Sequence, residues 1–488
     1  MSRRGAAADA VMDTDAQSVG QAVMAADGAV PPTSTHRPPA LVTSPIRRTV
    51  LMLALPVLGE QLLNTLVGLV DTFLSGRISV DATAAVGLAS YVGWLMAMLF
   101  MLVGTGTTAL VSRAIGAGRP DEANHVANQS FTLATFNGLI GAAFIYALAP
   151  SFATWQNMRG STYDITVDYL RIEAIGHAFT SMTLVGGAAL RGVGDMRTPL
   201  KVLSIVNAVN VILSPALVWG VGPLPDCGVN GIVLGTVIAR IGGAILMVTV
   251  LARGKSGLKL HATMLAPVWN TIRRVLWIGI PAAGEGAVMW IGQFFFLLII
   301  ARLAEGEVGK AFYAAHFIGV RLESLTYLPA VAWAAAAATM IGQALGAGVP
   351  RRAKRVGHEA ALQCALLALA STILFIIFAP QIMRAMHDSP LVREVGVPAL
   401  RLVALFQPCM AFSIVYLGAM RGAGATRYPL LITIITMLLF RLPIAYVCGI
   451  VLQGGLIGAW AGMVTDMTLR ATLATLRYRR GEWLHVRV

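Results

Sequence analysis

Three polar side chains, those of Glu60, Asn64 and Asp71, interrupt a long apolar run. On a helix that turns about 100° per residue, Asn64 lies about 40° and Asp71 about 20° from Glu60, so the three share one face. A carboxylate in apolar surroundings favours the uptake of a proton or another cation, because its charge is otherwise uncompensated. The chemistry that this face could perform is therefore the reversible binding of a cation.

A second set of candidates lies in the later half of the sequence. His316, Glu323 and Tyr327 share a helical face, at offsets of seven and eleven residues. Arg321 points about 140° away from His316, so we interpret it as one partner of a structural ion pair. The three residues on the shared face are candidates for a substrate cavity.

Two other patterns are less specific. Asn207, Asn210 and Ser214 fall within about 60° of one another on a helix, where they offer polar atoms to a ligand or simply satisfy helix contacts. Large adaptable side chains also recur at helical spacing, namely Tyr91, Trp94, Met98 and Met101. Methionines and aromatic rings suit an adaptable surface that attracts cationic ligands, but ordinary helix packing explains the same spacing.

The composition shows what kind of element must carry these residues. Of the 488 residues, 57% are hydrophobic and only 12% are Asp, Glu, Lys or Arg. That is about half the charge of an ordinary soluble domain, so most of the surface must face lipid. A soluble multidomain enzyme, a disordered chain and a disulfide scaffold are excluded. The four cysteines show no paired spacing and indicate neither disulfides nor a metal site.

Apolar segments of about 17–25 residues can cross a bilayer. They must be helices, because lipid offers no hydrogen-bond partner to an open strand edge. We predict twelve such spans: 49–74, 84–112, 124–149, 164–189, 200–220, 230–252, 271–301, 310–344, 354–378, 395–420, 428–451 and 455–477. The predicted fold class is an all-α polytopic membrane protein with about twelve transmembrane helices.

The basic residues predict the orientation. The net charge is +14, and Lys and Arg gather in short segments between apolar runs, as at 273–274, 351–355 and 477–480. Such loops lie on the cytoplasmic side of a membrane, so we expect both termini to be cytoplasmic. No stripe of basic and aromatic residues supports nucleic-acid binding. Residues 1–45 lack the apolar core of a signal peptide and are predicted to form a disordered cytosolic tail.

The sequence contains an internal repeat. Residues 114–123 recur at 344–353 and residues 190–200 recur at 420–430, each time with a shift of 230. Pro56 and Glu60 reappear as Pro281 and Glu285 in the same order. Each half then holds six helices, so the halves share one orientation and are related by a pseudo-twofold axis along the membrane normal, with a cavity between them. Glu285 thereby joins Glu60 and Asn64 as a cavity candidate.

The predicted parts follow from the repeat. They are the tail at 1–45, a first lobe at 46–253, a cytoplasmic linker at 254–270, a second lobe at 271–480 and a short cytoplasmic tail at 481–488.

These motifs resemble the multidrug and toxic compound extrusion (MATE) family of secondary transporters. The residues that carry the resemblance are Leu55-Pro56-x-x-x-Glu60, Val70-Asp71-Thr72-x-x-x-Gly76-Arg77, Leu345-Gly-Ala-Gly-Val-Pro350, the two Arg-Gly-x-Gly loops at 191 and 421, and Ala314-Ala-His-x-x-x-x-Arg-x-Glu-Ser324. The resemblance covers about residues 45–485. It implies two six-helix lobes around a cavity, in the inner membrane of a bacterium, and export of cationic or amphipathic compounds driven by inward Na+ or H+.

The resemblance also implies a cation site. Asp71 matches the acidic residue on the first helix of many members, and Thr236 matches a threonine of the site in the amino-terminal lobe. Asn210-x-x-x-Ser214-Pro215 resembles the same site, except that members often carry Asp where Ser214 stands. An oxygen cage of Asp71, Asn210, Ser214 and Thr236 would suit Na+, a hard cation, whereas Asp71 alone would suit H+. The alternative is that Asp71 is an acid at the outer membrane interface.

The leading hypothesis is a monomeric antiporter that exports organic cations or amphipathic drugs by alternating access. Its partners would be the lipid bilayer and small organic cations, with Na+ or H+ as coupling ion and no cofactor or resident metal. The alternative is a flippase or exporter of a lipid-linked or other endogenous metabolite. A membrane enzyme would need converging nucleophile, base or metal-ligand residues, and the sequence indicates none. Among the acids, the mechanism would depend on Glu60, Asp71, Glu285 and Glu323.

Overall fold

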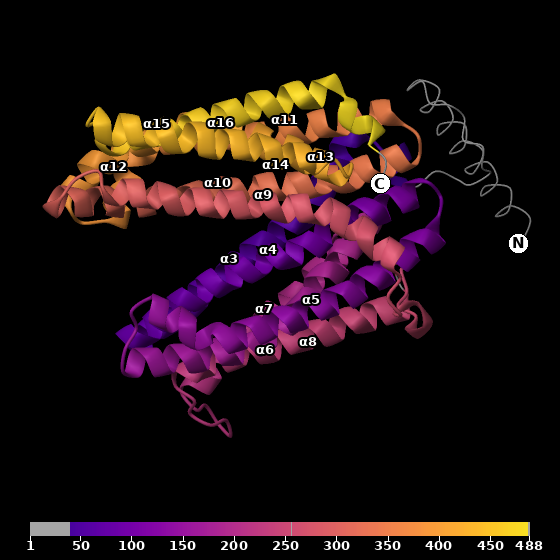
Figure 1. The fold of residues 1–488 in the computed structure, drawn as a ribbon, viewed down its shortest axis with the longest axis horizontal. Coiled ribbons are helices and arrows are strands. Elements are labelled where there is room, and N and C mark those ends of the chain that lie inside the picture. Colours follow the sequence, from indigo (N-terminus) through magenta and orange to yellow (C-terminus); the bar gives the residue numbers. More distant parts are fainter. Residues whose placement is uncertain (1–39, 255, 487–488) are drawn as a thin grey trace, which may run out of the picture. The chain divides into compact units, whose positions relative to one another are not determined.

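The fold is given by a computed structural model of the chain, which describes residues 40–254 and 256–486. The described residues are almost entirely helical (Figure 1), because a backbone in lipid must satisfy its polar groups within the segment. Of the predicted tail, residues 1–39 lie outside the described part. Residues 40–43 form the short helix α2 (Ala40–Thr43). Arg352 stabilises it by donating hydrogen bonds to the carbonyls of Leu41, at 3.1 Å, and Ser44.

Twelve helical segments correspond to the twelve predicted spans. The first six are α3 (Ile46–Ile78), α4 (Val80–Gly116), α5 (Pro120–Trp155), α6 (Ser161–Val193), α7 (Arg197–Val218) and α8 (Val229–Arg253). The others are α9 (Trp269–Ala301), α10 (Gly306–Gly346), α11 (Pro350–Met386), the pair α12 (Pro390–Leu405) and α13 (Gln407–Gly422), the segment from α14 (Arg427–Ile434) to η3 (Val447–Val451), and α16 (Gly455–Arg480).

Length and apolarity alone identify fewer spans than twelve. Among the described residues, nine helices are apolar enough to cross a membrane, and the pair α12 and α13 makes a tenth. The other two are α6, with 33 residues, and α16, with 26. Both are long enough, but neither contains a sufficiently apolar stretch. Among their charged residues, Glu173 of α6 and Asp466 and Arg470 of α16 belong to the polar clusters described below.

The chain divides into two compact units. The unit that we call the N-unit contains Pro56–Ser112 and Arg119–Ala283, and the C-unit contains the rest of the described residues. The N-unit core gathers around Met96, Phe100 and Leu170. The C-unit core gathers around Phe296 and Trp460. The units differ from the predicted lobes at 46–253 and 271–480, chiefly because the linker and the start of α9 belong to the N-unit.

One predicted span is broken. Helices α12 and α13 meet at Phe406 with a bend of 47°, whereas a single span was expected at 395–420. Pro408 explains the break, because proline has no N–H to donate to the carbonyl four residues earlier, that of Ala404. Thr372 of α11 satisfies this carbonyl instead, with a hydroxyl donor at 2.7 Å.

The segment that follows α14 contains π-helical turns. Ile435–Arg441 forms η2, and after α15 (Leu442–Tyr446) a second π-helical stretch forms η3. Pro443 is the second residue after the end of η2 and lacks the N–H that an α-helix would use there. Such turns are rare and are enriched at functional sites. Here the first of them ends at Arg441, which is buried.

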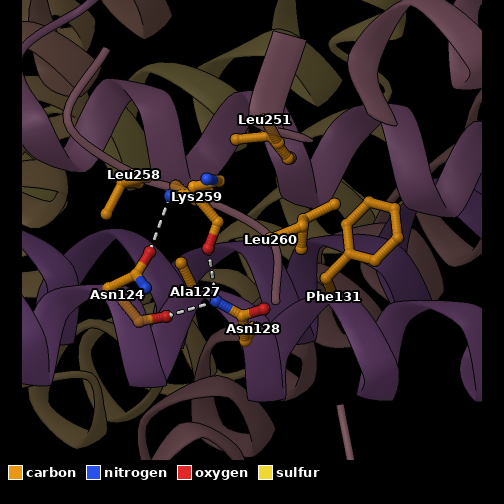
Figure 2. A pocket seen from close by; sticks show the side chains of 10 residues that line it. Asn124, Ala127, Asn128, Phe131, Leu251, Leu258, Lys259 and Leu260 are labelled. Carbon is orange, nitrogen blue, oxygen red and sulfur yellow. Dashed lines mark hydrogen bonds between the residues drawn. The ribbon is translucent and has the colours of Figure 1, made fainter. Parts of the chain in front are cut away.

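The linker between the repeats packs along α5. Asn128 donates to the carbonyl of Lys259 and accepts from the N–H of His261, both at 2.9 Å. Gln129 donates to the carbonyls of Met264 and Ala266 and accepts from the N–H of Val268. Figure 2 shows the side chains of Asn124 and Asn128 hydrogen-bonded to the backbone of Lys259. These residues line a small cavity of about 10 Å³. These side-chain amides satisfy the backbone polar groups of the linker. In its described part, the linker therefore needs no regular secondary structure beyond the short turn η1 (Ala262–Met264).

Asp195 connects the linker to the start of α7. Its carboxylate accepts hydrogen bonds from the backbone N–H groups of Arg197 and Thr198, from the Thr198 hydroxyl and from the Ser256 hydroxyl. Partial burial would raise the pKa of Asp195, but the four hydrogen bonds outweigh it and hold the pKa below its ordinary value. Asp195 is therefore a charged anchor between the linker and the start of α7 at neutral pH.

Candidate functional site

Three of the four predicted cation-coupling residues meet between α7 and α8. Asn210 Nδ2 donates to Thr236 Oγ1 at 2.8 Å and lies 3.4 Å from Ser214 Oγ. The hydroxyls of Ser214 and Thr236 both donate to the carbonyl of Ile232. The acceptor atom of the amide, Asn210 Oδ1, is buried without a hydrogen-bond partner among the described residues. The structure thus brings these three together and leaves one buried oxygen available.

Glycine makes this approach of the two helices possible. A Cβ on Gly235 of α8 would lie 2.7 Å from Ser214 Cα and 2.8 Å from its backbone nitrogen. Any larger residue at this position would separate α7 from α8 and break the hydrogen bonds between Asn210 and Thr236.

Asp71, the fourth predicted residue, belongs to a different set of contacts. Within the described residues no hydrogen bond joins it to Asn210, and its Oδ1 is buried without a hydrogen-bond partner. Its charge lies within electrostatic range of Arg240 on α8 and of Glu173 on α6. Tyr169, also on α6, lies within range of the same three charges. Asp71 is therefore part of a buried charged cluster on α3, α6 and α8.

Glu173 and His177 complete this cluster, which we call the N-unit acid cluster (Asp71, Glu173, His177 and Arg240). Glu173 Oε1 lies 3.5 Å from Arg240 Nη1 and 3.6 Å from His177 Nε2. Glu173 is 8% and His177 2% exposed. Glu173 Oε2 and both ring nitrogens of His177 make no hydrogen bond in the described part of the chain.

The formal charges of the N-unit acid cluster do not balance. With both carboxyl groups ionised, Asp71 and Glu173 would supply two negative charges against one positive charge from Arg240 and none from a neutral His177. An uncompensated charge in an apolar interior is costly. The cluster therefore favours the uptake of one further cation.

The repeat produces two matching ion pairs. Arg191 Nη1 on α6 lies 3.1 Å from Glu60 Oε2 on α3. Arg421 Nη1 on α13 donates to both carboxylate oxygens of Glu285 on α9, at 2.9 and 2.8 Å. Glu60 and Glu285, predicted as cavity candidates, are thus each engaged by the arginine of an Arg-Gly-x-Gly loop.

The C-unit contains a second charged cluster, with balanced charge. Asp466 on α16 accepts hydrogen bonds from Arg470, the shortest at 2.7 Å, and lies 3.6 Å from Arg441 Nη1. Glu323, predicted for the cavity, lies within electrostatic range of Arg441 and Asp466. Two acids and two arginines compensate one another, so this cluster needs no additional cation. His316, also predicted for the cavity, accepts a hydrogen bond from Trp460 Nε1 at 3.2 Å.

The other cavity candidates do not enter these clusters. Asn64 on α3 and Tyr327 on α10 are exposed, as is Trp94 on α4, and Met98 is partly buried. A surface groove of about 370 Å³ lies in the C-unit, but none of the predicted site residues lines it.

Four charged residues were missed from the sequence: Glu173, Asp466 and Arg470, which are buried, and Arg240, which is partly buried. Each falls inside a predicted span, and the short list of mechanistic acids omitted both Glu173 and Asp466. The signal that could have found them is the cost of an ionisable residue within a span. In α6 this signal is reinforced by His177, one helical turn after Glu173.

Comparison with known proteins places this fold in a family. The MatE family model matches residues 56–216 and 281–447. The probable multidrug resistance protein NorM of Thermotoga maritima is 31% identical over 440 residues, which cover 90% of this chain and 93% of that protein. The chain belongs to the MATE family. The multidrug resistance protein MdtK of Yersinia enterocolitica is a further MATE relative, 27% identical over 90% of this chain and 95% of its own.

Solved MATE structures confirm the fold. An outward-facing conformation of a multidrug resistance MATE family transporter of the MOP superfamily matches with a TM-score of 0.84, at 22% identity, over 92% of this chain and 99% of that chain. The predicted all-helical membrane fold with about twelve spans is thus confirmed. MATE proteins are transporters, so family membership also supports the prediction that the chain is no enzyme.

Proposed function

We propose that this MATE transporter is a secondary antiporter that exports organic cations or amphipathic drugs in exchange for inward-moving Na+ or H+. The observation that carries the proposal is the charge imbalance of the N-unit acid cluster. A site with one uncompensated negative charge binds one cation readily but disfavours a second. A drug cation and a coupling ion that compete for it are exchanged, which is the basis of antiport.

Asp71 is the coupling carboxylate in this proposal. Its Oδ1 has no hydrogen-bond partner among the described residues. Glu173 Oε2 also has none, but the other oxygen of Glu173 lies 3.5 Å from Arg240 Nη1. Asn210, Ser214 and Thr236 position the neighbouring part of α7 and α8, with Asn210 Oδ1 as an additional acceptor.

The substrate class is supported by the relatives and by the predicted cavity residues. Both relatives described above are named for multidrug resistance. Exposed aromatic side chains such as Trp94 and Tyr327 offer faces that attract organic cations. The relatives are bacterial, which supports the plasma membrane as the location. The basic loops support cytoplasmic termini, and the presence of both repeats in one chain supports a monomer.

Ethidium transport into proteoliposomes tests the proposal, with Na+ and pH gradients imposed separately. We expect one of the gradients to drive ethidium transport by the wild type and neither to drive it by Asp71→Asn. Asp168→Asn is the matched control, because Asp168 is an exposed acid on α6, and it should transport like the wild type. No response of the wild type to either gradient would contradict antiport. Equal gradient-driven transport by Asp71→Asn would remove Asp71 from the mechanism.

A further inference from the structure

Basic residues from three distant parts of the chain lie at one end of the C-unit. These parts are the first turns of α3, the first turns of α11 and the end of α16 with the residues that follow it, at 46–55, 350–363 and 476–486. Together they contain nine Lys and Arg residues but only two acids. Glu359 lies 3.8 Å from Arg47 Nε, and Glu482 lies 2.6 Å from Arg477 Nη2. Two acids cannot balance nine bases, so these segments carry a large positive excess.

Hydrogen bonds hold the three segments together. On one side of α11, Gln363 Nε2 donates to the carbonyl of Arg47 at 2.9 Å, and Arg352 bonds the backbone just before α3, as described above. On the other side, Lys354 Nζ donates to the carbonyl of Arg479 at 2.7 Å. The first turns of α11 therefore connect the start of α3 to the end of α16, and the basic side chains of all three lie close to one another.

Most of these bases are on the surface. We call five exposed ones the C-unit basic patch (Arg48, Arg351, Arg355, Arg479 and Arg480). They stand at the ends of three predicted spans, where the polar headgroups of a bilayer begin. A concentration of like charges repels itself, so the patch favours a partner that brings negative charge.

Exposed apolar side chains continue the same helical faces toward the middle of the spans. On α3, Met52 lies about 40° from Arg48, and on α11, Leu362 lies about 20° from Arg351. Met52 is 49% and Leu362 51% exposed. Each helix thus presents a positive charge at its end and an apolar surface beside it, which is the arrangement of headgroup and acyl chain in a phospholipid.

We propose that the C-unit basic patch binds the headgroups of anionic phospholipids, with their acyl chains along the apolar faces of α3 and α11. Because basic loops are expected on the cytoplasmic side, these lipids belong to the inner leaflet. Basic residues at a membrane surface attract anionic lipids over about a Debye length. A soluble phosphate compound would gain from the charge but leave the apolar faces unused, so the favoured partner is a lipid.

The binding of phosphatidylglycerol with a fluorescent acyl chain to the purified full-length protein in detergent micelles tests the proposal. We expect the wild type to bind this lipid more tightly than phosphatidylcholine with the same chains, and added salt to reduce the difference. A variant that combines Arg48→Gln, Arg351→Gln and Arg480→Gln removes one base from each segment. Since each base near an anionic surface raises the affinity about fivefold, this variant should bind phosphatidylglycerol about a hundredfold more weakly.

The matched control combines Arg77→Gln, Arg159→Gln and Arg302→Gln. It lowers the net charge by the same amount but removes exposed bases outside the three segments. Its affinity for phosphatidylglycerol should stay close to that of the wild type. Unchanged phosphatidylcholine binding and melting temperature show that both variants are folded. If the combined patch variant is unstable, Arg351→Gln alone takes its place, with an expected loss of about fivefold.

Four results would overturn the proposal. Equal affinities of the wild type for the two lipids would exclude selection of an anionic headgroup. Equal phosphatidylglycerol affinities of the wild type and the patch variant would exclude the patch, and equal losses in the patch and control variants would assign the effect to net charge. Displacement of phosphatidylglycerol by an equal concentration of glycerol phosphate would assign the patch to a soluble ligand. Lipid binding is measured without transport, so these outcomes are independent of the proposed antiport.

Discussion

Arg421 Nη1 lies 2.9 and 2.8 Å from the two carboxylate oxygens of Glu285. The first half of the chain repeats the relationship, with Arg191 3.1 Å from Glu60. In each half, the acid follows a proline in a long helix, and the arginine precedes a Gly-x-Gly turn. The repeat is thus expressed in contacts as well as in sequence.

Removing one partner of the Glu285–Arg421 pair should destabilise the protein. Glu285→Gln leaves the buried guanidinium uncompensated, at a cost of about 3–5 kcal/mol. Denaturation in detergent micelles would measure it, and Glu359→Gln is the control. Glu359 lies 3.8 Å from Arg47, which is 86% exposed, so its loss should cost about 0–1 kcal/mol. Equal effects of the two substitutions would show that the Glu285 pair is not a buried one.

A glycine substitution tests the packing of α7 on α8. Gly235→Ala forces a methyl group against the backbone of Ser214 and should cost about 1–3 kcal/mol, together with the loss of gradient-driven ethidium transport. Gly242 is on the same helix, and a Cβ there would have nothing within 4 Å. Gly242→Ala should therefore be neutral or stabilising by about 0.5–1 kcal/mol. Thermal stability measured for both variants decides whether the close approach at Gly235 is required.

If Pro408 causes the break between α12 and α13, the loss of stability caused by Thr372→Val should depend on whether Pro408 is present. Thr372→Val removes the donor to the carbonyl of Ala404 and should cost about 1–3 kcal/mol. In a Pro408→Ala background the same change should cost much less, because residue 408 then has an N–H for this carbonyl. A double-mutant cycle on thermal stability measures the difference. Additive effects would mean that Pro408 is not the cause of the break.

Release of the linker should be visible in hydrogen exchange. Asn128→Ala removes the side chain that pairs with the backbone of Lys259 and His261, so amides of residues 258–266 should exchange faster, with little effect elsewhere. Thr135→Ala on the same helix is the control, since its hydroxyl donates to the carbonyl of Phe131 within α5. Unchanged exchange in Asn128→Ala would show that other contacts hold the linker.

Asp195 predicts a pH-dependent contribution to stability. Because the pKa of Asp195 is lower in the folded state than its ordinary value of about 3.9, its contribution is fully present above that value and is lost as the pH falls through the folded-state pKa. Asp195→Asn should therefore be less stable than the wild type at neutral pH, and the two should converge below about pH 4. Thermal melting over this range checks it. A constant difference down to the lowest pH would exclude the charge as the cause.

The fold was largely predictable from the sequence, because apolar length and the absence of water restrict the choice to helices. The details that were missed depend on particular partners. The bend at Phe406 needed the recognition that Pro408 frees the carbonyl of Ala404 and that Thr372 lies within reach. The helix at 40–43 depends on Arg352, more than 300 residues away in the sequence.

The site was only partly predictable for a similar reason. Helical spacing grouped Asn210 with Ser214, and the structure places them together. Spacing within one helix could not show that Arg191 and Arg421 reach Glu60 and Glu285. Spacing within one helix also could not predict the contact between Glu173 of α6 and Arg240 of α8, because that contact depends on how the two helices pack.

The two ion pairs also bear on how the protein is made. Glu60 and Arg191 are 131 residues apart, and Glu285 and Arg421 are 136 residues apart, so each pair lies within one half of the chain. Once residue 191 has left the ribosome, both charges of the first pair are present. The first six helices can thus compensate Glu60 inside the bilayer before residue 285 has been synthesised. Each half of the chain therefore contains both its glutamate and the arginine that compensates it when that half inserts into the membrane.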